Sequence, residues 1–214
     1  AIVFDFDGVI IDSTSVKTEA FVETYSDCSA SFQDYVRQYH EDNQGCPRRE
    51  KIEHFASVIG ETQLTSVEKR IECFAELAFA KVKASPLFAG VDGGLKDLKQ
   101  GRRLYVASAT PAAELEETLE VKQISDLFET SWGFPVRKAD AINLVRKRHD
   151  FERGEILMIG DSAADREAAV EAGVPFLGVA FGGEKHPFPE SCPVVHDFSE
   201  IKVFVERCQV SPVA

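Results

Sequence analysis

The sequence predicts an α/β protein whose core of parallel strands and helices is interrupted near its start by an inserted block of helices. Two observations predict this. Between Ser13 and Ser85 the chain holds only two glycines and one proline, which favours uninterrupted helices. The 129 residues from Pro86 onward hold eleven glycines and eight prolines, and short apolar runs alternate there with helical stretches. Such alternation indicates a parallel sheet with right-handed crossovers.

The first element is an apolar strand at Ile2–Phe6, and the helical block follows it. The spacing of apolar residues in the block predicts four helices, Thr14–Tyr25, Ser31–Glu41, Arg48–Ile59 and Ser66–Ala84. The last helix must end before Pro86, because proline cannot continue it. Within that helix Phe74, Leu77 and Ala78 recur at helical spacing, so we expect them to pack as a buried stripe.

Three later apolar runs are the expected buried strands of the core, Arg103–Ala107, Ile156–Ile159 and Val174–Phe181. Four helices are expected around them, Ala112–Val121, Ala139–Arg148, Ala163–Ala172 and Phe198–Cys208. The predicted organisation is therefore a core domain of residues 1–12 and 86–214, with an all-α domain inserted at residues 13–85.

The composition excludes several classes of protein. A formal net charge of −12 repels phosphodiester backbones, so we expect no nucleic-acid partner. No apolar run reaches the roughly 18 residues of a membrane span, so we expect no membrane partner. The five cysteines are scattered and form no C-x-x-C pair, which favours free thiols in a reducing cytoplasm over disulfides or a zinc site.

Two carboxylates mark the end of the first strand, where Asp5 and Asp7 are followed by Gly8. The carboxyl edge of a parallel sheet is where α/β proteins place their active sites. A glycine permits the tight exit that brings Asp7 towards Asp5. Burying two charges costs several kcal/mol each unless they are compensated, so a solvated strand end explains this pair poorly.

A second pair of acids, Asp161 and Asp165, follows the strand at Ile156–Ile159. Asp165 lies one helical turn later and can face back towards Asp161. The simplest interpretation is that Asp161 or Ser162 caps the next helix. One capping residue is enough for a helix, so two acids are more than capping requires. Acids on two neighbouring strand ends repel one another without a cation, and carboxylate oxygens suit Mg²⁺. The sequence therefore predicts a magnesium site.

Two further segments supply groups that bind anions. Ser108 ends the strand Arg103–Ala107, just before a helix start with Pro111, and its hydroxyl can bind a phosphoryl oxygen, although these residues also mark ordinary helix starts. Lys138 opens the helix Ala139–Arg148, where a cation opposes the helix dipole. It is either a functional cation or a solvated surface lysine, and the neighbouring Arg137 is the alternative cation.

In this order the four segments resemble the motifs of the haloacid dehalogenase-like (HAD) hydrolase superfamily, and the resemblance covers essentially the whole chain. DFDGVIIDS resembles motif I, VASAT motif II, Lys138 motif III and IGDSAAD motif IV. The context of Lys138, VRKADAI, departs from the commoner G-K-P form. The insertion resembles the helical cap of the phosphoglycolate phosphatase and β-phosphoglucomutase branch. This resemblance implies a Rossmann-like parallel core with an all-α cap.

The resemblance also implies roles for the residues. Asp5 would be the nucleophile that becomes an aspartyl-phosphate, and Asp7 would protonate the leaving oxygen and then activate water. Ser108, Ala109 and Lys138 would bind the phosphoryl group that is transferred.

The same resemblance implies a set of ligands for Mg²⁺. Asp5, the backbone carbonyl of Asp7 and Asp161 would hold the ion. Asp165 would be either a further ligand or a support for the others.

The cap would supply selectivity. Gly45-Cys46-Pro47-Arg48 resembles a G-x-x-R segment that contacts substrate in the β-phosphoglucomutase-like branch. Gly45 and Arg48 are the candidate contacts to substrate, and Arg49 is the alternative. The simplest interpretation is an exposed helix start that carries basic residues. Lys17 stands where many relatives with such a cap carry histidine. The five histidines of this chain, among them His40, show no paired spacing and are expected at the surface or in the core.

The sequence therefore predicts a Mg²⁺-dependent phosphatase that acts on a small phosphate ester, expected to be a sugar or polyol phosphate. A phosphomutase of the β-phosphoglucomutase type is one alternative, because it would share Asp5 and Asp7. A non-catalytic binding domain on the same scaffold is the other. We expect a cytoplasmic protein that is a monomer or a weak homodimer.

Overall fold

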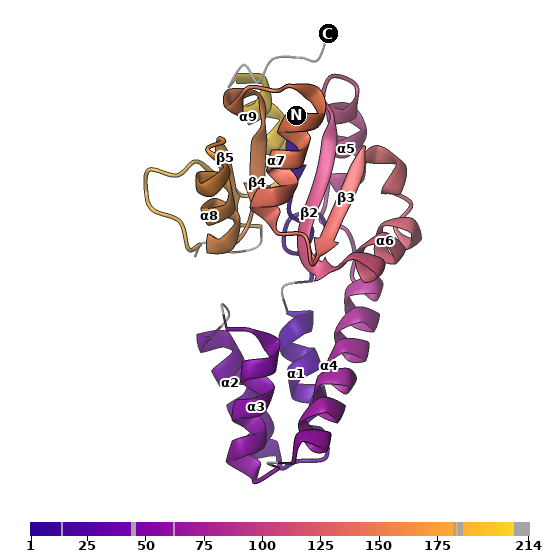
Figure 1. Cartoon of the computed structure of the whole chain (residues 1–214), viewed down its shortest axis with the longest axis vertical. Coiled ribbons are helices and arrows are strands. Elements are labelled where there is room, and N and C mark those ends of the chain that lie inside the picture. Colours follow the sequence, from indigo (N-terminus) through magenta and orange to yellow (C-terminus); the bar gives the residue numbers. More distant parts are fainter. Residues whose placement is uncertain (14, 44–45, 62, 182, 184–185, 208–214) are drawn as a thin grey trace. The chain divides into compact units, whose positions relative to one another are not determined.

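A computed structural model of the chain describes residues 1–13, 15–43, 46–61, 63–181, 183 and 186–207. The chain forms two compact units (Figure 1). The core unit comprises residues 1–12 and the chain from Pro86 onward, and the helical unit is Ser13–Ser85. The core unit is an α/β structure and the helical unit holds only helices among its described elements, so the predicted fold class is confirmed.

In the described residues the core unit contains one sheet of parallel strands in the order β3-β2-β1-β4-β5-β6. The strands are β1 (Ile2–Phe4), β2 (Leu104–Pro111), β3 (Thr130–Phe134), β4 (Leu157–Gly160), β5 (Phe176–Val179) and β6 (Val194–Val195). Strand β1 lies in the middle, with Ile2 opposite Leu104 on β2 and Leu157 on β4. Because the strands are parallel, the residues that follow β1, β2 and β4 meet at one edge of the sheet.

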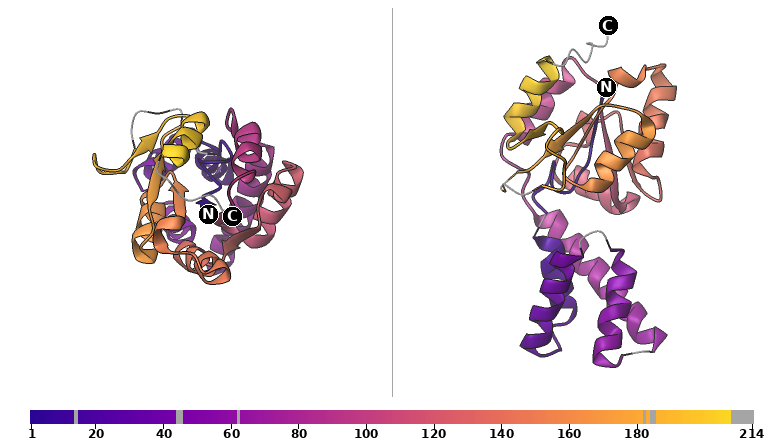
Figure 2. Two further views of the ribbon diagram at one scale, coloured as in Figure 1. Left: turned by 90° about the horizontal axis from the view of Figure 1, so that it is seen from above. Right: turned by 90° about the vertical axis from the view of Figure 1, so that its left-hand side faces the viewer.

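Helices cover both faces of this sheet (Figure 2): α5 (Val91–Lys99) and α9 (Phe198–Arg207) lie on one face, and α7 (Lys138–His149) and α8 (Ala163–Ala172) on the other. Side chains of a strand alternate between faces. Val3 accordingly packs in the cluster that includes residues of α7 and α8, while the ring of Phe4 stacks on Phe198 of α9 with centroids 6.2 Å apart. The strand is buried on both faces, as its unbroken apolar run predicts.

Two strands and one α-helix of the core unit were not predicted from the sequence. The edge strand β3 reads TSWGF and has no apolar run, because an edge strand needs less burial. Helix α5 contains the pair Gly93-Gly94, which reads as a break in a helical pattern. Strand β6 has only two residues. By contrast α6 (Ala112–Val121) and α8 begin and end where the sequence predicts.

The helical unit contains α1 (Val16–Thr24), α2 (Ala30–Asp42), α3 (Arg48–Ile59) and α4 (Leu64–Ala84). Aromatic rings fill its interior, and Phe21 stacks on Phe74 with centroids 4.0 Å apart. Phe74 is buried, and Leu77 and Ala78 pack partly buried against the same cluster, as their helical spacing predicts.

One buried polar pair joins α2 and α3 in the helical unit. The Nζ of Lys51 lies 2.9 Å from Nδ1 of His40, and only 1% of Lys51 is exposed. The ammonium group also lies 5.6 Å from the ring centroid of Phe21. Burial lowers the pKa of His40 to about 4, and the charges of Lys51 and Lys17 add to this effect. His40 is therefore neutral near pH 7, and its Nδ1 accepts the hydrogen bond.

The cysteines and the lengths of the helices bear on two of the expectations from the sequence. Cys28, Cys46, Cys73 and Cys192 are free thiols, and Cys208 lies outside the described residues. No helix in the described part of the chain combines the length and the apolar character that crossing a membrane requires.

Candidate active site

Carboxylates converge where β1 and β4 end. Asp5 follows β1 directly and Asp161 follows β4, while Asp165 lies in the first turn of α8. Each of these three residues offers a carboxylate oxygen, and the three atoms all lie within 4.8 Å of one another. Asp165 is fully buried and Asp5 is 5% exposed. This acidic cluster matches the sequence prediction that the strand ends bring these residues together.

Gly8 makes room for this cluster. Its φ of +75° lies in the left-handed region, and its N–H donates to the carbonyl of Ile11 in a tight turn. A Cβ atom on Gly8 would lie 2.0 Å from Oδ2 of Asp161. The glycine is therefore required both by the turn and by the close approach of the Asp161 carboxylate.

The carboxylates of the cluster are crowded. Burial raises the pKa of Asp5 well above its ordinary value, and the charge of Asp165 adds to this effect against the opposing charge of Lys138. Burial and the charge of Asp165 likewise raise the pKa of Asp161 to about 6. Both shifts are those expected of carboxylates that are buried and that also lie close to one another. The cluster can therefore accept a further cation, and its hard oxygen donors suit Mg²⁺.

Lys138 is the cation that the protein itself supplies. Its Nζ lies 2.9 Å from Oδ2 of Asp5 and 2.5 Å from Oδ1 of Asp165. Burial alone would lower the pKa of this lysine, but the two carboxylates outweigh burial and leave the pKa above its ordinary value. The alternative cation, Arg137, is exposed and pairs with Glu171 at 2.6 Å. The structure thus brings Lys138 and not Arg137 to the acids.

Asp165 has a structural role as well as a place in the cluster. Its Oδ2 accepts hydrogen bonds from the backbone N–H of Ser162 at 3.1 Å and from the Ser162 hydroxyl at 2.5 Å. Ser162 caps α8, and the two residues form a capping box. Asp165 therefore takes part in capping α8 and also holds Lys138, so capping explains more of this second acid than the sequence indicated.

Asp7 has a different partner. Its Oδ2 accepts a hydrogen bond of 2.9 Å from the hydroxyl of Thr110, at the end of β2. The buried Ser108 lies two residues earlier, and its Oγ accepts the N–H of Thr110 at 3.1 Å. Ala109 is exposed between them. Thr110 was not among the residues predicted for the site, although Ser108 and Thr110, two hydroxyl residues spaced by two near a strand end, are a signal that could have identified it.

The remaining candidates belong to the helical unit. Arg48, at the start of α3, is exposed, and its guanidinium lies 5.8 Å from the ring centroid of Phe74. Arg49 instead pairs with Glu68 at 2.7 Å. Lys17 is half-buried on α1, and Gly45 lies outside the described residues.

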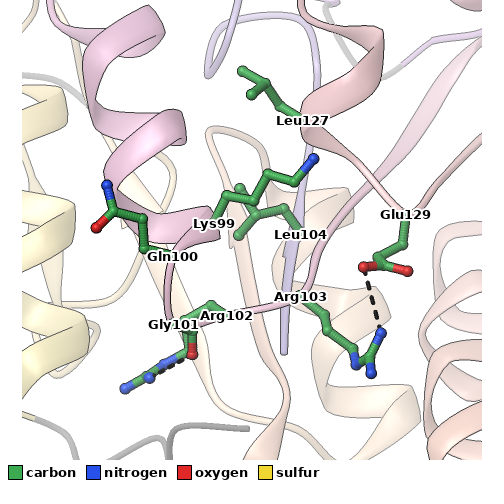
Figure 3. A pocket seen from close by; sticks show the side chains of 8 residues that line it. All are labelled: Lys99, Gln100, Gly101, Arg102, Arg103, Leu104, Leu127 and Glu129. Carbon is green, nitrogen blue, oxygen red and sulfur yellow. Dashed lines mark hydrogen bonds and ion pairs between the residues drawn. The ribbon is translucent and has the colours of Figure 1, made fainter.

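A cavity of about 170 Å³ lies at the opposite edge of the sheet, before β2 and β3 begin (Figure 3). Three cations line it, but each has its own partner. Arg103 lies 3.4 Å from Glu129, Lys99 donates to the carbonyl of Asp126, and Arg102 donates to that of Gly101. The side chains of Arg102 and Arg103 point apart in Figure 3, so this cavity has no common point where the cations meet.

Comparison with known proteins agrees with this geometry. The model of the haloacid dehalogenase-like hydrolase family matches residues 2–179. A phosphoglycolate phosphatase from Vibrio vulnificus is 33% identical over 106 residues, which span 47% of this chain and 46% of that protein. A phosphorylated carbohydrates phosphatase from Thermotoga maritima is 26% identical over 81% of this chain and 82% of its own length.

A solved structure shows the same fold. It is a haloacid dehalogenase-like family hydrolase from Streptococcus pneumoniae, 20% identical in sequence. It superposes with a TM-score of 0.72 and covers 95% of this chain and 96% of its own.

Proposed function

We propose that this chain, which belongs to the haloacid dehalogenase-like hydrolase family, hydrolyses small phosphomonoesters through a covalent phosphate on Asp5. The observation that carries the proposal is that Nζ of Lys138 lies 2.9 Å from Oδ2 of Asp5. The carboxylate of Asp7 takes no part in this contact and is hydrogen-bonded to Thr110 instead. A nucleophilic carboxylate, a fixed cation and a separate proton carrier are what phosphoryl transfer through an aspartyl-phosphate requires.

In the first step, one carboxylate oxygen of Asp5 forms a bond to phosphorus. The bond from phosphorus to the leaving oxygen breaks, and its electron pair stays on that oxygen. Asp7 enters this step protonated and gives its proton to the leaving oxygen, so that an alcohol departs. Lys138 and Ser108 hold the phosphoryl oxygens, and the ammonium group offsets their charge.

In the second step, Asp7 takes a proton from water. The oxygen of that water forms a bond to phosphorus as the bond from phosphorus to Asp5 breaks. Inorganic phosphate leaves, the carboxylate of Asp5 is restored, and Asp7 is protonated again. Two displacements at phosphorus thus replace a single direct attack by water.

The acidic cluster fits Mg²⁺, because its donors are carboxylate oxygens that lie close together. We assign Asp5, Asp161 and the backbone carbonyl of Asp7 as the groups that hold the ion. Both oxygens of Asp165 already accept hydrogen bonds, so we assign Asp165 to the support of Lys138. When bound, Mg²⁺ supplies positive charge to the phosphoryl oxygens.

The substrate class we propose is a sugar or polyol phosphate, in keeping with the Thermotoga relative named for phosphorylated carbohydrates. We propose that the helical unit is a cap that recognises the part of the substrate that does not react. Arg48 is its candidate contact, because Arg49 already pairs with Glu68. Lys17 is the second candidate.

Turnover tests this function directly. The purified chain should release phosphate from at least some members of a panel of sugar, polyol and small carboxylate phosphates when Mg²⁺ is present. Asp5→Asn should abolish turnover and covalent labelling by phosphate, because an amide is a poor nucleophile. Asp7→Asn should keep the fold but lose about 10²–10⁴-fold in rate. The exposed Asp34 offers a matched control, and Asp34→Asn should remain active. Substantial turnover by Asp5→Asn would overturn the mechanism.

A further inference from the structure

We propose that Thr110 is a positioning residue that orients Asp7 for proton transfer, an inference that rests on the proposed phosphatase function. The hydroxyl of Thr110 donates to Oδ2 of Asp7 at 2.9 Å. The two residues are 103 positions apart in the chain, so the contact depends on the pairing of β1 with β2.

An irregularity in β2 directs Thr110 to this contact. Ala107 pairs with Trp132 on β3, whereas Pro111 pairs with Phe134, so residues 108–110 lie opposite Gly133 alone. Extra residues of this kind form a bulge, which bends the strand and redirects its side chains. A Cβ atom on Gly133 would lie 2.5 Å from the carbonyl oxygen of Thr110. The glycine therefore allows the bulge to lie against β3.

The bulge is also fixed from within. The backbone N–H of Thr110 donates to Oγ of Ser108 at 3.1 Å, and Ser108 is only 1% exposed. The serine proposed to hold the phosphoryl group thus also fixes the threonine that binds Asp7. Residues 108–110 of β2 therefore connect Ser108, proposed to bind the phosphoryl group, to Asp7, the proposed proton carrier.

The donated hydrogen bond has a chemical consequence for Asp7. Thr110 holds Oδ2 of Asp7 through this hydrogen bond and therefore fixes the orientation of the carboxyl group. This matters most when the leaving oxygen needs a proton in order to depart. An alkoxide leaves only with a proton, whereas a nitrophenolate leaves without one.

The experiment compares Thr110→Val, which keeps the branched shape, with Thr110→Ser, which keeps the hydroxyl. Each is assayed with Mg²⁺ on glycerol 2-phosphate and on 4-nitrophenyl phosphate. Thr110→Val should lower kcat/KM for the alkyl ester about 10–100-fold and for the aryl ester no more than about threefold, because kcat/KM reports only the steps up to departure of the leaving oxygen. The second step, in which Asp7 acts as a base, is common to both esters and does not enter kcat/KM. Thr110→Ser should recover most of the lost rate. Equal unfolding temperatures of the variants would establish that the fold is intact.

A double-mutant cycle makes the test specific for Asp7. If Thr110 acts through Asp7, Thr110→Val should change the residual rate of Asp7→Asn by less than about twofold. An equal loss of kcat/KM on both esters, no rescue by serine, or full additivity with Asp7→Asn would overturn the positioning role while leaving the phosphatase function intact. A wild-type chain that hydrolyses neither these esters nor the panel of phosphates would overturn both.

Discussion

Lys138 in the core unit and Lys51 in the helical unit are both withdrawn from water, but their partners differ. Lys138 lies between the carboxylates of Asp5 and Asp165, and Lys51 lies against the neutral ring of His40. The pKa of Lys138 is raised because the two carboxylates outweigh its burial, whereas burial lowers the pKa of Lys51. The core unit therefore offsets the charge of its lysine with two carboxylates, whereas the hydrogen-bond partner of Lys51 is a neutral ring.

The two environments predict different responses to substitution. Removing one partner of a buried ionic group leaves the other charges uncompensated, which costs about 3–5 kcal/mol. Removing a buried cation whose partner is neutral takes away an unbalanced charge, and an apolar side chain of similar size can then be neutral or stabilising. Four experiments can sharpen or break this contrast between the two units.

The largest expected effect is that of metal removal, which acts on the acidic cluster of the core unit. Exhaustive chelation with EDTA should abolish phosphatase activity, and excess Mg²⁺ should restore it. Ca²⁺ should inhibit, because its larger coordination number and looser geometry misplace the nucleophile. All three residues of this cluster belong to the core unit, so we expect the helices of the helical unit to persist and the far-UV circular dichroism of the chain to change little. Full activity after rigorous chelation would contradict the assignment.

The second experiment exchanges each lysine for methionine. Lys138→Met should lower kcat/KM by at least about 10²-fold and destabilise the core unit, because Asp5 and Asp165 lose their counter-charge. Lys51→Met should leave activity on 4-nitrophenyl phosphate within about twofold and stability unchanged or higher. Steady-state kinetics and thermal unfolding measure both effects. Similar losses of activity in the two variants would remove the contrast.

The third experiment concerns selectivity and compares neighbours on α3. Arg48→Ala should lower kcat/KM for the best sugar or polyol phosphate by about 10–100-fold, the range for a lost charged hydrogen bond. Hydrolysis of 4-nitrophenyl phosphate should fall much less, because the aryl group offers the arginine no polar contact. Arg49→Ala is the matched control, since Arg49 pairs with Glu68. A selective loss in Arg49→Ala instead would transfer the role to that residue.

The smallest expected effect is a dependence of stability on pH in the helical unit. The folded pKa of His40 is about 4, below its ordinary value of 6.5. Between pH 4 and pH 6.5 the unfolded chain therefore binds more protons than the folded chain. The contribution of His40 to the free energy of unfolding is complete above about pH 6.5 and decreases as the pH falls towards 4. The slope from this group is at most about 1.4 kcal/mol per pH unit.

Chemical unfolding between pH 7 and pH 4.5 measures this slope. The double variant His40→Phe with Lys51→Met replaces the polar pair with apolar groups and should lose the contribution. An unchanged slope in the double variant would assign the pH dependence to other groups.

The meeting of Asp5, Asp161 and Asp165 was predictable, because parallel strands bring their carboxyl ends to one edge. Lys138 could be proposed from its place at a helix start, but its choice over Arg137 required the contacts. Thr110 escaped prediction because a bulge directs it, and the register shift that makes the bulge leaves no mark in the pattern of apolar residues.

The helical unit shows a different limit of prediction. Periodicity places Arg48–Ile59 correctly as a helix, since apolar residues repeat along it. The same reasoning places a lysine on the solvated face of a helix, and Lys51 is instead buried beside Ile52. Sequence patterns identify which face is apolar on average, but they do not reveal a polar pair that is satisfied inside that face.

The central place of β1 in the sheet also bears on how the chain folds as it is made. Ile2 pairs with residues about 100 and about 155 positions later, whereas each contact within the helical unit joins residues of one 73-residue segment. Contacts that are distant in sequence form slowly, and domains emerge from the ribosome in chain order. The helical unit can therefore form its interior before β4 has been synthesised and can pair with β1. The acidic cluster and Lys138 come together only after most of the chain has been synthesised, so the nascent protein lacks the candidate active site until its core closes.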